Sequence, residues 1–439
     1  MTMKRILTAL CMLAALPLAA QQHSGPWSLQ DCIRYALEHS ISVKQQAIAA
    51  EQAAIEVETA QWARVPGLSG SASQNYSFGR GLSADNTYVN TNTASTGFDL
   101  GTSLNIFSGF RQTETIRLRK LDLETANANL ERARNDISVA VARAYVQVLY
   151  DMEILGVAQR QIEIDSLQVE RLAEMLRNGK ASAVELSQQK AALEQGRYTL
   201  TQAQNSLSLD ILSLTQLLEL PSPEGFTVAV PSSELRMQLL ENPDDIYAEA
   251  VETRPEIRAE QLRLQGFDSQ IRLAKSALYP SLSLSGGVGS NYYRTDGYDF
   301  QPFREQIRNN FSQFVGLSLN VPIFNKFATR GSIRSAQLGR EAQALTLQNA
   351  KNSLYKEIQQ AYYNAVAARS RYYSSSQAAE AADESFALVQ AKYEAGKASI
   401  TEFNESKNAA LKSGSDLAQA RYEWLFQLKL LEFYKGVGF

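Results

Sequence analysis

Four segments of the chain alternate apolar and small polar side chains with the two-residue period of a β-strand. The apolar faces carry Leu68, Gly70, Ala72, Tyr76 and Phe78; Phe98, Leu100, Thr102, Leu104 and Ile106; Leu282, Leu284 and Val288; and Val315, Leu317, Leu319, Val321 and Ile323. The opposite faces consist mainly of Ser, Asn and Gly, with hardly any Lys or Glu. A soluble sandwich has the same period but turns charged side chains to water. The pattern therefore predicts strands of about ten residues that cross an outer membrane at a tilt.

Two longer segments are typical of continuous helix. Residues 111–178 and 328–395 are 68 residues each, rich in Ala, Leu, Gln, Glu and Arg, and free of proline. At a rise of ~1.5 Å per residue each helix would reach ~100 Å, so it must pack in a coiled coil or stacked bundle. Gly179 and Gly396 follow, where a helix would end and the chain would reverse. Return helices are expected over residues 183–219 and 400–434.

The chain carries an internal duplication. Residues 36–71 align with 250–285 at a constant shift of 214, and residues 106–186 align with 323–403 at a constant shift of 217. The sequence Gly-Lys-Ala-Ser of the first turn recurs without a gap in the second. A period of about 215 residues is too long for a solenoid, so we expect two copies of one large module. The predicted domains are a signal peptide, 1–20, and two structural repeats, 21–248 and 249–439.

The first twenty residues are typical of a secretory signal peptide, with Lys4 and Arg5 before an apolar run over residues 6–18. This run is too short to cross a ~30 Å hydrocarbon core as a helix. Cys11 raises lipidation as an alternative, but the bulky Leu10 precedes it where a lipidation site has a small residue. We therefore expect ordinary cleavage near Ala20.

Composition narrows the possible partners. Cleavage would leave 41 Lys and Arg against 46 Asp and Glu, a mildly acidic balance that argues against nucleic acid. Of the two cysteines only Cys32 would remain, so no intramolecular disulfide is expected. No later stretch approaches ~18 uninterrupted apolar residues, which excludes a channel made of membrane helices.

The strand count predicts an oligomer. A sheet in contact with lipid must close, because an open edge leaves backbone groups unpaired. The smallest membrane barrels use about eight strands, whereas one chain supplies four. Two chains would give a barrel that side chains fill, and three would give twelve strands around a lumen. We therefore expect a homotrimer whose shared barrel contacts outer-membrane lipid.

Three motifs resemble the TolC-type outer-membrane efflux family. Residues 27–40, WSLQDCIRYALEHS, resemble its opening motif, with Cys32 replacing a small residue and Ser40 replacing asparagine. Residues 317–327, LSLNVPIFNKF, are similar to the end of a family strand, although the first copy lacks the proline. The turn from Tyr393 resembles the family's repeated turn, whose first copy here has Leu176 in place of tyrosine. The resemblance covers essentially the whole mature chain.

The resemblance implies a mostly helical, internally duplicated, TolC-like trimer. A shared twelve-stranded barrel would stand on a long periplasmic α-helical barrel, and the proline-rich segment 221–255 would join an equatorial belt. The implied function is an outer-membrane channel subunit of a tripartite efflux or type I secretion system in a Gram-negative cell. Such a subunit is a passive export conduit, coupled to an inner-membrane transporter through a periplasmic adaptor protein.

No catalytic, cofactor or metal site is expected. The only histidines are His23 and His39, so the chain has neither a histidine-based triad nor a zinc motif. The glycines of Gly286-Gly287-Val288-Gly289 belong to a strand, because no basic residue or helix start follows them as in a phosphate loop.

Acidic residues beyond the second turn are candidates for a periplasmic aperture. Glu402 and Glu405 lie three residues apart, on one helix face, and the resemblance implies that such acids ring the aperture. Like-charge packing would then raise some of their proton affinities. Glu185 holds the matching place in the first half, and Tyr393 matches a family tyrosine that ties to an acid of the first turn. Ala398 stands where the family has an arginine, so Lys397 is the nearest cation. Whether a salt bridge closes the aperture is therefore left undecided by the sequence. A solvated helix face is the alternative.

The two turns are candidates for contact with the adaptor's helical hairpin, through Gly179, Lys180, Gly396 and Lys397. Plain turn chemistry is the alternative, because Gly, Lys and small residues make good helix reversals. An aromatic girdle is expected where the strands end, from Tyr76, Phe78, Tyr88, Tyr292 and Tyr293, with core packing as the alternative.

Two other classes of protein compete with the channel. A structural or adhesive coiled-coil protein at the cell surface would have no use for four strands with an apolar face. An enzyme is disfavoured, because no catalytic arrangement is found. The sequence does not identify the cargo, which is a drug, a metal or a protein, or the pump that the channel serves.

Overall fold

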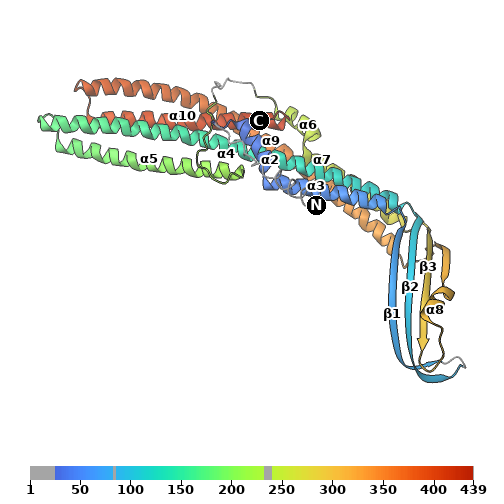
Figure 1. Cartoon of the computed structure of the whole chain (residues 1–439). Helices are drawn as coiled ribbons and strands as arrows, with labels where there is room; N and C mark the ends of the chain where they lie inside the picture. The colour runs from blue at the N-terminus through green and yellow to red at the C-terminus, as the bar shows by residue number, and fades with distance from the viewer. Residues whose placement is uncertain (1–24, 83–85, 232–239, 439) are drawn as a thin grey trace, which may run out of the picture. The chain divides into compact units, whose positions relative to one another are not determined.

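A computed structural model describes residues 25–82, 86–231 and 240–438. The predicted signal peptide and His23 lie outside these residues. The chain forms two compact units, shown in Figure 1. The helical unit contains the described residues up to Lys44, Ala133–Ala250 and those from Lys356 onward; the sheet unit contains Gln45–Arg132 and Val251–Tyr355. Each unit therefore draws segments from both halves of the sequence.

The two halves repeat one order of elements. The first contains α2 (Leu29–His39), α3 (Ile41–Trp62), β1 (Gly67–Leu82), β2 (Tyr88–Ser108), α4 (Arg111–Arg177) and α5 (Ala183–Leu217). The second contains α6 (Pro243–Thr253), α7 (Pro255–Ser276), β3 (Ser281–Thr295), α8 (Phe303–Asn309), β4 (Ser312–Asn320), α9 (Ala328–Glu394) and α10 (Ile400–Tyr434). Among the described elements, α8, between β3 and β4, is the one without a counterpart in the first half.

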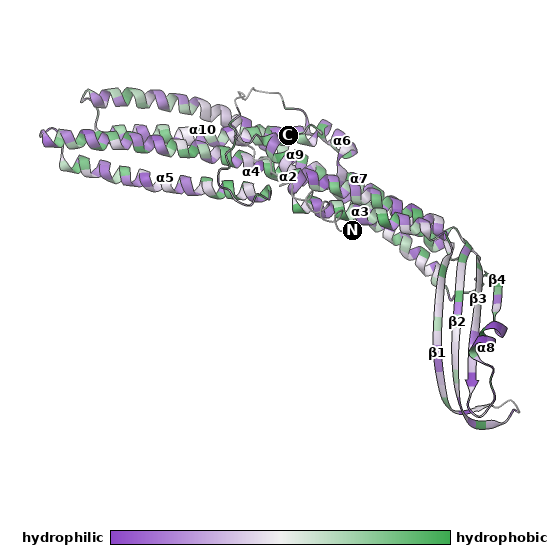
Figure 2. Ribbon diagram, viewed as in Figure 1, coloured by the Kyte–Doolittle hydropathy of each residue, from purple (hydrophilic) through white to green (hydrophobic). Residues whose placement is uncertain are grey.

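The long helices agree with the sequence. Helices α4 and α9 are 67 residues each, and the return helices α5 and α10 are 35 residues each. In Figure 2 hydrophobic and hydrophilic residues are mixed along all of them. Among the described residues no helix is both long enough and apolar enough to span a membrane.

The four strands form one antiparallel sheet in the order β1-β2-β3-β4, so within the described part of the chain β1 and β4 each have one edge without a neighbouring strand. The register brings the predicted apolar positions onto one face. Leu100 lies opposite Gly70 and Val288, and Leu284 lies opposite Leu104 and Leu317. The predicted common face is therefore confirmed over most of the sheet.

The strands differ from the prediction at their ends. Strands β1 and β2 have 16 and 21 residues, longer than the expected ten or so. A register shift between Asn105 and Phe107 places Phe107, rather than Ile106, opposite Leu282, because a bulge inserts one extra residue. Strand β4 ends at Asn320, so Val321 and Ile323 follow the strand instead of belonging to it. Pro322 between them has no backbone N–H to pair.

The opening motif anchors the start of the described chain in the core of the helical unit. Ser28 caps α2 in a capping box with Asp31, and Cys32 and Ala36 are fully buried in an apolar cluster of the helical unit. Trp27 forms a parallel β-bridge with Val228 of the proline-rich segment. Burial raises the pKa of the Cys32 thiol to about 12, so this free cysteine is an inert packing group.

A tyrosine side chain bonds the backbone on both sides of this bridge. The Tyr145 hydroxyl of α4 lies 3.0 Å from the Trp27 carbonyl oxygen and 2.5 Å from that of Ala229. Burial raises its pKa to about 12, so the hydroxyl keeps the proton that it donates to these carbonyls.

Candidate functional site

The repeated motif Gly-Lys-Ala-Ser shapes the first helix reversal through Gly179, the backbone N–H of Lys180 and the side chain of Ser182. Gly179 has φ +68°, and its N–H donates to the Leu176 carbonyl at 3.0 Å, while the Lys180 N–H donates to the Met175 carbonyl at 2.7 Å. These two bonds are a Schellman motif, which satisfies carbonyls at the end of α4. Ser182 then caps α5, accepting from the Glu185 N–H at 3.1 Å while the Glu185 carboxylate accepts from the Ser182 N–H at 2.8 Å.

The second reversal repeats this geometry. Gly396 has φ +71° and donates to the Tyr393 carbonyl at 3.0 Å, and the Lys397 N–H donates to the Lys392 carbonyl at 2.8 Å. Ser399 and Glu402 form the capping box of α10, with the Ser399 N–H donating to the Glu402 carboxylate at 2.7 Å. The repeat of the motif therefore has a local reason, helix reversal, which supports the turn-chemistry alternative. The Lys180 and Lys397 ammonium groups are exposed and make no ion pair with the described residues.

An apolar cluster fastens the two hairpins together behind the turns. Its buried residues are Leu172 of α4 and Ile400 and Phe403 of α10, with exposed fractions of 2%, 6% and 0%. Leu186 of α5 and Tyr393 of α9 pack against them. All four long helices thus contribute to one cluster, and Figure 1 shows both reversals at the same end of the helical unit.

The predicted tyrosine has a cation that sequence reasoning missed. The Arg171 guanidinium of α4 lies 5.2 Å from the centre of the Tyr393 ring and donates to the Glu394 carbonyl at 3.3 Å. Burial raises the pKa of Tyr393, and nearby Arg171 lowers it while nearby Glu185 raises it. The expected tie between Tyr393 and Glu185 stays a prediction. The missing family arginine at Ala398 is not replaced by Lys397 at this tyrosine, because the cation comes from the other hairpin.

The predicted aperture acids differ from each other. Both Glu402 and Glu405 are exposed and line a groove of about 370 Å³ between α9 and α10 that also contains Lys392 and Lys397. Hydrogen bonds from Ser399 lower the pKa of Glu402, with a smaller contribution from Lys392. In the single chain this carboxylate therefore has a lowered pKa, whereas the raised proton affinity expected from like-charge packing concerns the trimer and stays a prediction. Glu405 is the acid that remains outside the cap.

A buried ion pair lies behind the apolar cluster. Lys407 of α10 and Asp165 of α4 form a salt bridge with side chains 2% and 0% exposed. Gln189 of α5 donates to Asp165 at 2.9 Å and accepts from Asn404 of α10 at 3.1 Å. This network connects the two hairpins through charge and hydrogen bonds. The sequence pattern did not single out any of its members.

The apolar face of the sheet is uncovered over much of its area. Large apolar side chains on it remain exposed: Leu68 at 72%, Phe78 at 76%, Val315 at 83%, Leu317 at 66% and Leu319 at 65%. A soluble domain rarely exposes a contiguous apolar surface of this kind, so the face requires an apolar environment.

Helix α8 covers the part of β3 that β4 does not reach. Strand β4 pairs with β3 only as far as Gly289, and beyond it Gln306 bonds both backbone groups of Tyr293, at 2.9 and 3.0 Å. Tyr292 packs against Phe303 of α8, with ring centres 5.4 Å apart. Of the five predicted girdle residues, Tyr292 therefore packs within the structure, whereas Tyr76, Phe78, Tyr88 and Tyr293 are exposed.

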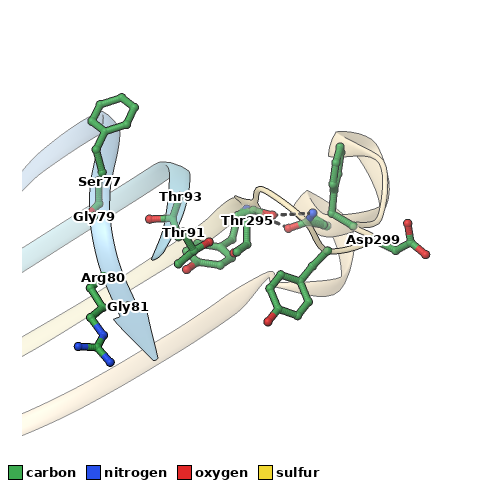
Figure 3. Close-up of a pocket in the computed structure, with 13 residues that line it drawn as sticks. Ser77, Gly79, Arg80, Gly81, Thr91, Thr93, Thr295 and Asp299 are labelled. Atoms are coloured by element: carbon green, nitrogen blue, oxygen red, sulfur yellow. Dashed lines mark hydrogen bonds between the residues drawn. The ribbon is translucent and has the colours of Figure 1, made fainter. Parts of the chain in front are cut away.

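A pocket of about 560 Å³ lies at this end of the sheet, lined by residues of β1, β2, β3, α8 and the segment between β3 and α8. Figure 3 shows Arg80 on β1 and Asp299 on opposite sides of it, pointing away from each other. Most of the polar residues that Figure 3 labels around the pocket carry hydroxyl groups, among them Ser77, Thr91 and Thr93. Within the described residues no group of three or more His, Cys, Asp or Glu side chains could hold a metal ion.

Comparison with known proteins agrees with this geometry. A family model described as outer membrane efflux protein matches residues 32–219 and 246–437. The probable efflux pump outer membrane protein TtgC of Pseudomonas putida is 24% identical over 339 residues, 73% of this chain and 66% of that protein. Outer membrane protein TolC of Escherichia coli is 22% identical over 359 residues, 79% of this chain and 71% of that protein. The chain thus spans just under two thirds of the length of the Pseudomonas relative.

Solved structures share the fold. Outer membrane protein VceC of Vibrio cholerae superposes with a TM-score of 0.76 at 19% identity, covering 93% of this chain and 96% of that chain. The outer membrane channel CmeC of Campylobacter jejuni superposes with a TM-score of 0.79 at 18% identity, covering 94% and 86%. The family model spans more than half of the chain and includes both halves of the duplication, so the family and outer-membrane location expected from the sequence are confirmed. The chain belongs to the outer membrane efflux protein family.

Proposed function

We propose that this chain is one of three identical subunits of an outer-membrane export channel. The observation that carries the proposal is the four-stranded sheet, which has an exposed apolar face and two edges without a neighbouring strand. In a membrane those edges must pair, because hydrocarbon offers no hydrogen-bonding groups. Three copies of the sheet give a closed barrel of twelve strands, in which β1 of one subunit pairs with β4 of the next.

Cross-linking between the edge strands tests this arrangement. Strands β2 and β3 separate β1 from β4 within one chain, so a disulfide between β1 and β4 can form only between chains. We would introduce one cysteine on β1, at Ser69, Ser71 or Ser73, together with Ser318→Cys on β4. Oxidation in outer-membrane vesicles should then give covalent dimers and trimers for at least one pair.

Single-cysteine variants are the matched controls, and they should remain monomers on denaturing gels. The buried Cys32 does not interfere, because its thiol is sequestered in the core. A stable monomer in native mass measurement of the detergent-extracted protein would refute the proposal. Cross-links absent from every pair, despite a measured trimer, would refute the shared barrel alone.

The helical unit forms the periplasmic part of the proposed conduit. Its hairpin ends converge in the trimer, and Glu405 from each subunit lines the aperture. Glu402 and Glu185 hold the first turns of α10 and α5 in place, and Tyr393 with Arg171 joins the two hairpins. The exposed turns at Lys180 and Lys397 contact a periplasmic adaptor protein, which links the channel to an inner-membrane transporter.

The channel is a passive conduit, and transport is driven by the pump. Relatives of this chain are named for efflux of toluene and of antibiotics, which favours export of small molecules. An adhesive coiled-coil protein is the competing function, and the exposed apolar sheet argues against it. Heat-resistant trimers in outer-membrane fractions distinguish the two, because an adhesin has no need to insert.

A further inference from the structure

A buried carboxyl group of α4 lacks a hydrogen-bond donor. Asp151 is 6% exposed, and its Oδ1 accepts from the Gln147 amide at 3.4 Å. Its Oδ2 is buried and has no partner within the described residues. An ionised carboxylate in this position would be desolvated with an unfilled acceptor, which is unfavourable.

A second carboxyl lies on the neighbouring helix α5. Leu149 of α4 and Leu214 of α5 share one buried apolar cluster, so the two helices pack together here, and Asp210 lies one turn before Leu214. Hydrogen bonding and charge from Asp210 both raise the pKa of Asp151. Two ionised carboxylates offer only acceptors to each other, so a hydrogen bond between them requires a proton on one. The pKa of the adjacent Tyr150 of α4 is raised, first by burial and then by the charges of Asp151 and of Asp416 on α10. Helix α10 therefore adds another acid near the pair.

We propose that the buried Asp151 and the half-buried Asp210 form a proton-binding site between α4 and α5, in which the two carboxyl groups share one proton. The proton supplies the donor that Asp151 Oδ2 lacks and removes the repulsion between the two groups. Both carboxyls belong to the helical unit of one chain.

The expected titration follows from burial and the second acid. The pKa of Asp151 is raised from 3.8 to about 7, first by burial and then by Asp210, with a smaller opposite effect of Gln147. Between these two pH values the folded protein holds a proton that the unfolded chain has lost. This contribution to stability is therefore complete below pH 3.8 and is lost as the pH rises towards about 7.

Deprotonation places two negative charges at one helix contact. Leu214, one turn from Asp210, and Leu149, beside Asp151, are at most 1% exposed and belong to the main apolar cluster. Loss of the proton should therefore loosen α4 from α5 at the edge of this core, and leave the hairpin ends unchanged.

Infrared spectroscopy of the intact protein in detergent tests the shared proton. At pH 6 ordinary carboxyls are ionised, so a protonated-carboxyl carbonyl band should come from this site and should disappear with a midpoint near pH 7. Asp151→Asn should abolish the band. If the Asp151→Asn protein fails to fold, loss of the band is measured in Asp210→Asn instead. Glu163→Gln, on an exposed position of α4, is the matched control and should leave it unchanged. Absence of the band at pH 6, or its survival in both Asp variants, would overturn the proposal.

Hydrogen exchange provides a second readout. Opening of α4 around Asp151 and of α5 around Asp210 should become at least tenfold more frequent at pH 8.5 than at pH 6, after correction for intrinsic rates. Asp151→Asn should remove this difference, because its amide supplies a donor without a charge. The same difference in the variant, or none in the parent, would mean that the pair does not couple a proton to helix packing.

Discussion

The buried pair of Lys407 and Asp165 allows a quantitative test of how the hairpins are joined. We would replace Lys407 with methionine, which keeps most of the apolar stem and removes the charge. Asp165 would then be a fully buried anion whose remaining described donor is the Gln189 amide. The reverse change, Asp165→Asn, would leave the Lys407 ammonium buried without its counter-charge.

The magnitude follows from the burial of both groups. With side chains 2% and 0% exposed, solvent cannot screen the charge that remains. Removing one partner of such a pair costs about 3–5 kcal/mol. At about 1.4 kcal/mol per tenfold change, local opening should become roughly 10² to 4 × 10³-fold more frequent. The double variant Asp165→Asn, Lys407→Met should be less destabilised than the sum of the single variants, because it leaves no unpaired charge.

Hydrogen exchange followed by mass spectrometry measures this opening helix by helix. The acceleration should be confined to α4, α5 and α10 near the pair, with β1–β4 unchanged. Lys412→Met, an exposed lysine on the same helix, is the control for charge loss alone. The assignment of this pair as a stabilising contact between the hairpins would be refuted if the single variants exchange like the control. It would also be refuted if the destabilisation of the double variant equals the sum of those of the single variants.

Three further predictions concern the sheet and the second turn. Leu317→Arg on the apolar face should cost about 2–4 kcal/mol near the membrane midplane, whereas Ser318→Arg on the opposite face should cost less; equal trimer yields in outer-membrane fractions would contradict the face assignment. Glu405→Gln should weaken the block of single channels by multivalent cations with assembly intact, and an unchanged block would make Glu405 an ordinary solvated residue. Ser399→Ala should fray the first turn of α10, measured by exchange. In the parent this turn should fray only below pH 4.5, because the pKa of Glu402 is lowered from 4.5 and its cap is lost as the pH falls through the lowered pKa.

Local signals were sufficient for the four long helices and for the sheet faces. The absence of proline over 111–178 and 328–395 predicted α4 and α9 to within a residue, and Gly179 and Gly396 marked the reversals. The two-residue period assigned the faces because both sides of each strand differ in polarity.

The missed features depend on pairing between distant segments. The bulge after Asn105 is invisible in the period, because Ile106 continues the alternation while the partner strand sets the register. Residues 88–97 of β2 are rich in Thr, Asn and Ser without alternation, so only their pairing with β1 reveals a strand. Asp165 and Lys407 are 242 residues apart, and neither stands out on its own helix.

The bridge between Trp27 and Val228 has a consequence for the order of folding. About 200 residues separate its two strands, so closing this contact carries a large loop entropy and must be late. During synthesis, Cys32 and Ala36 of α2 emerge long before α4 and α5 can cover them. Helix α2, the first of the described helices, is therefore among the last to dock, and its exposed face is where a periplasmic chaperone has the longest time to act.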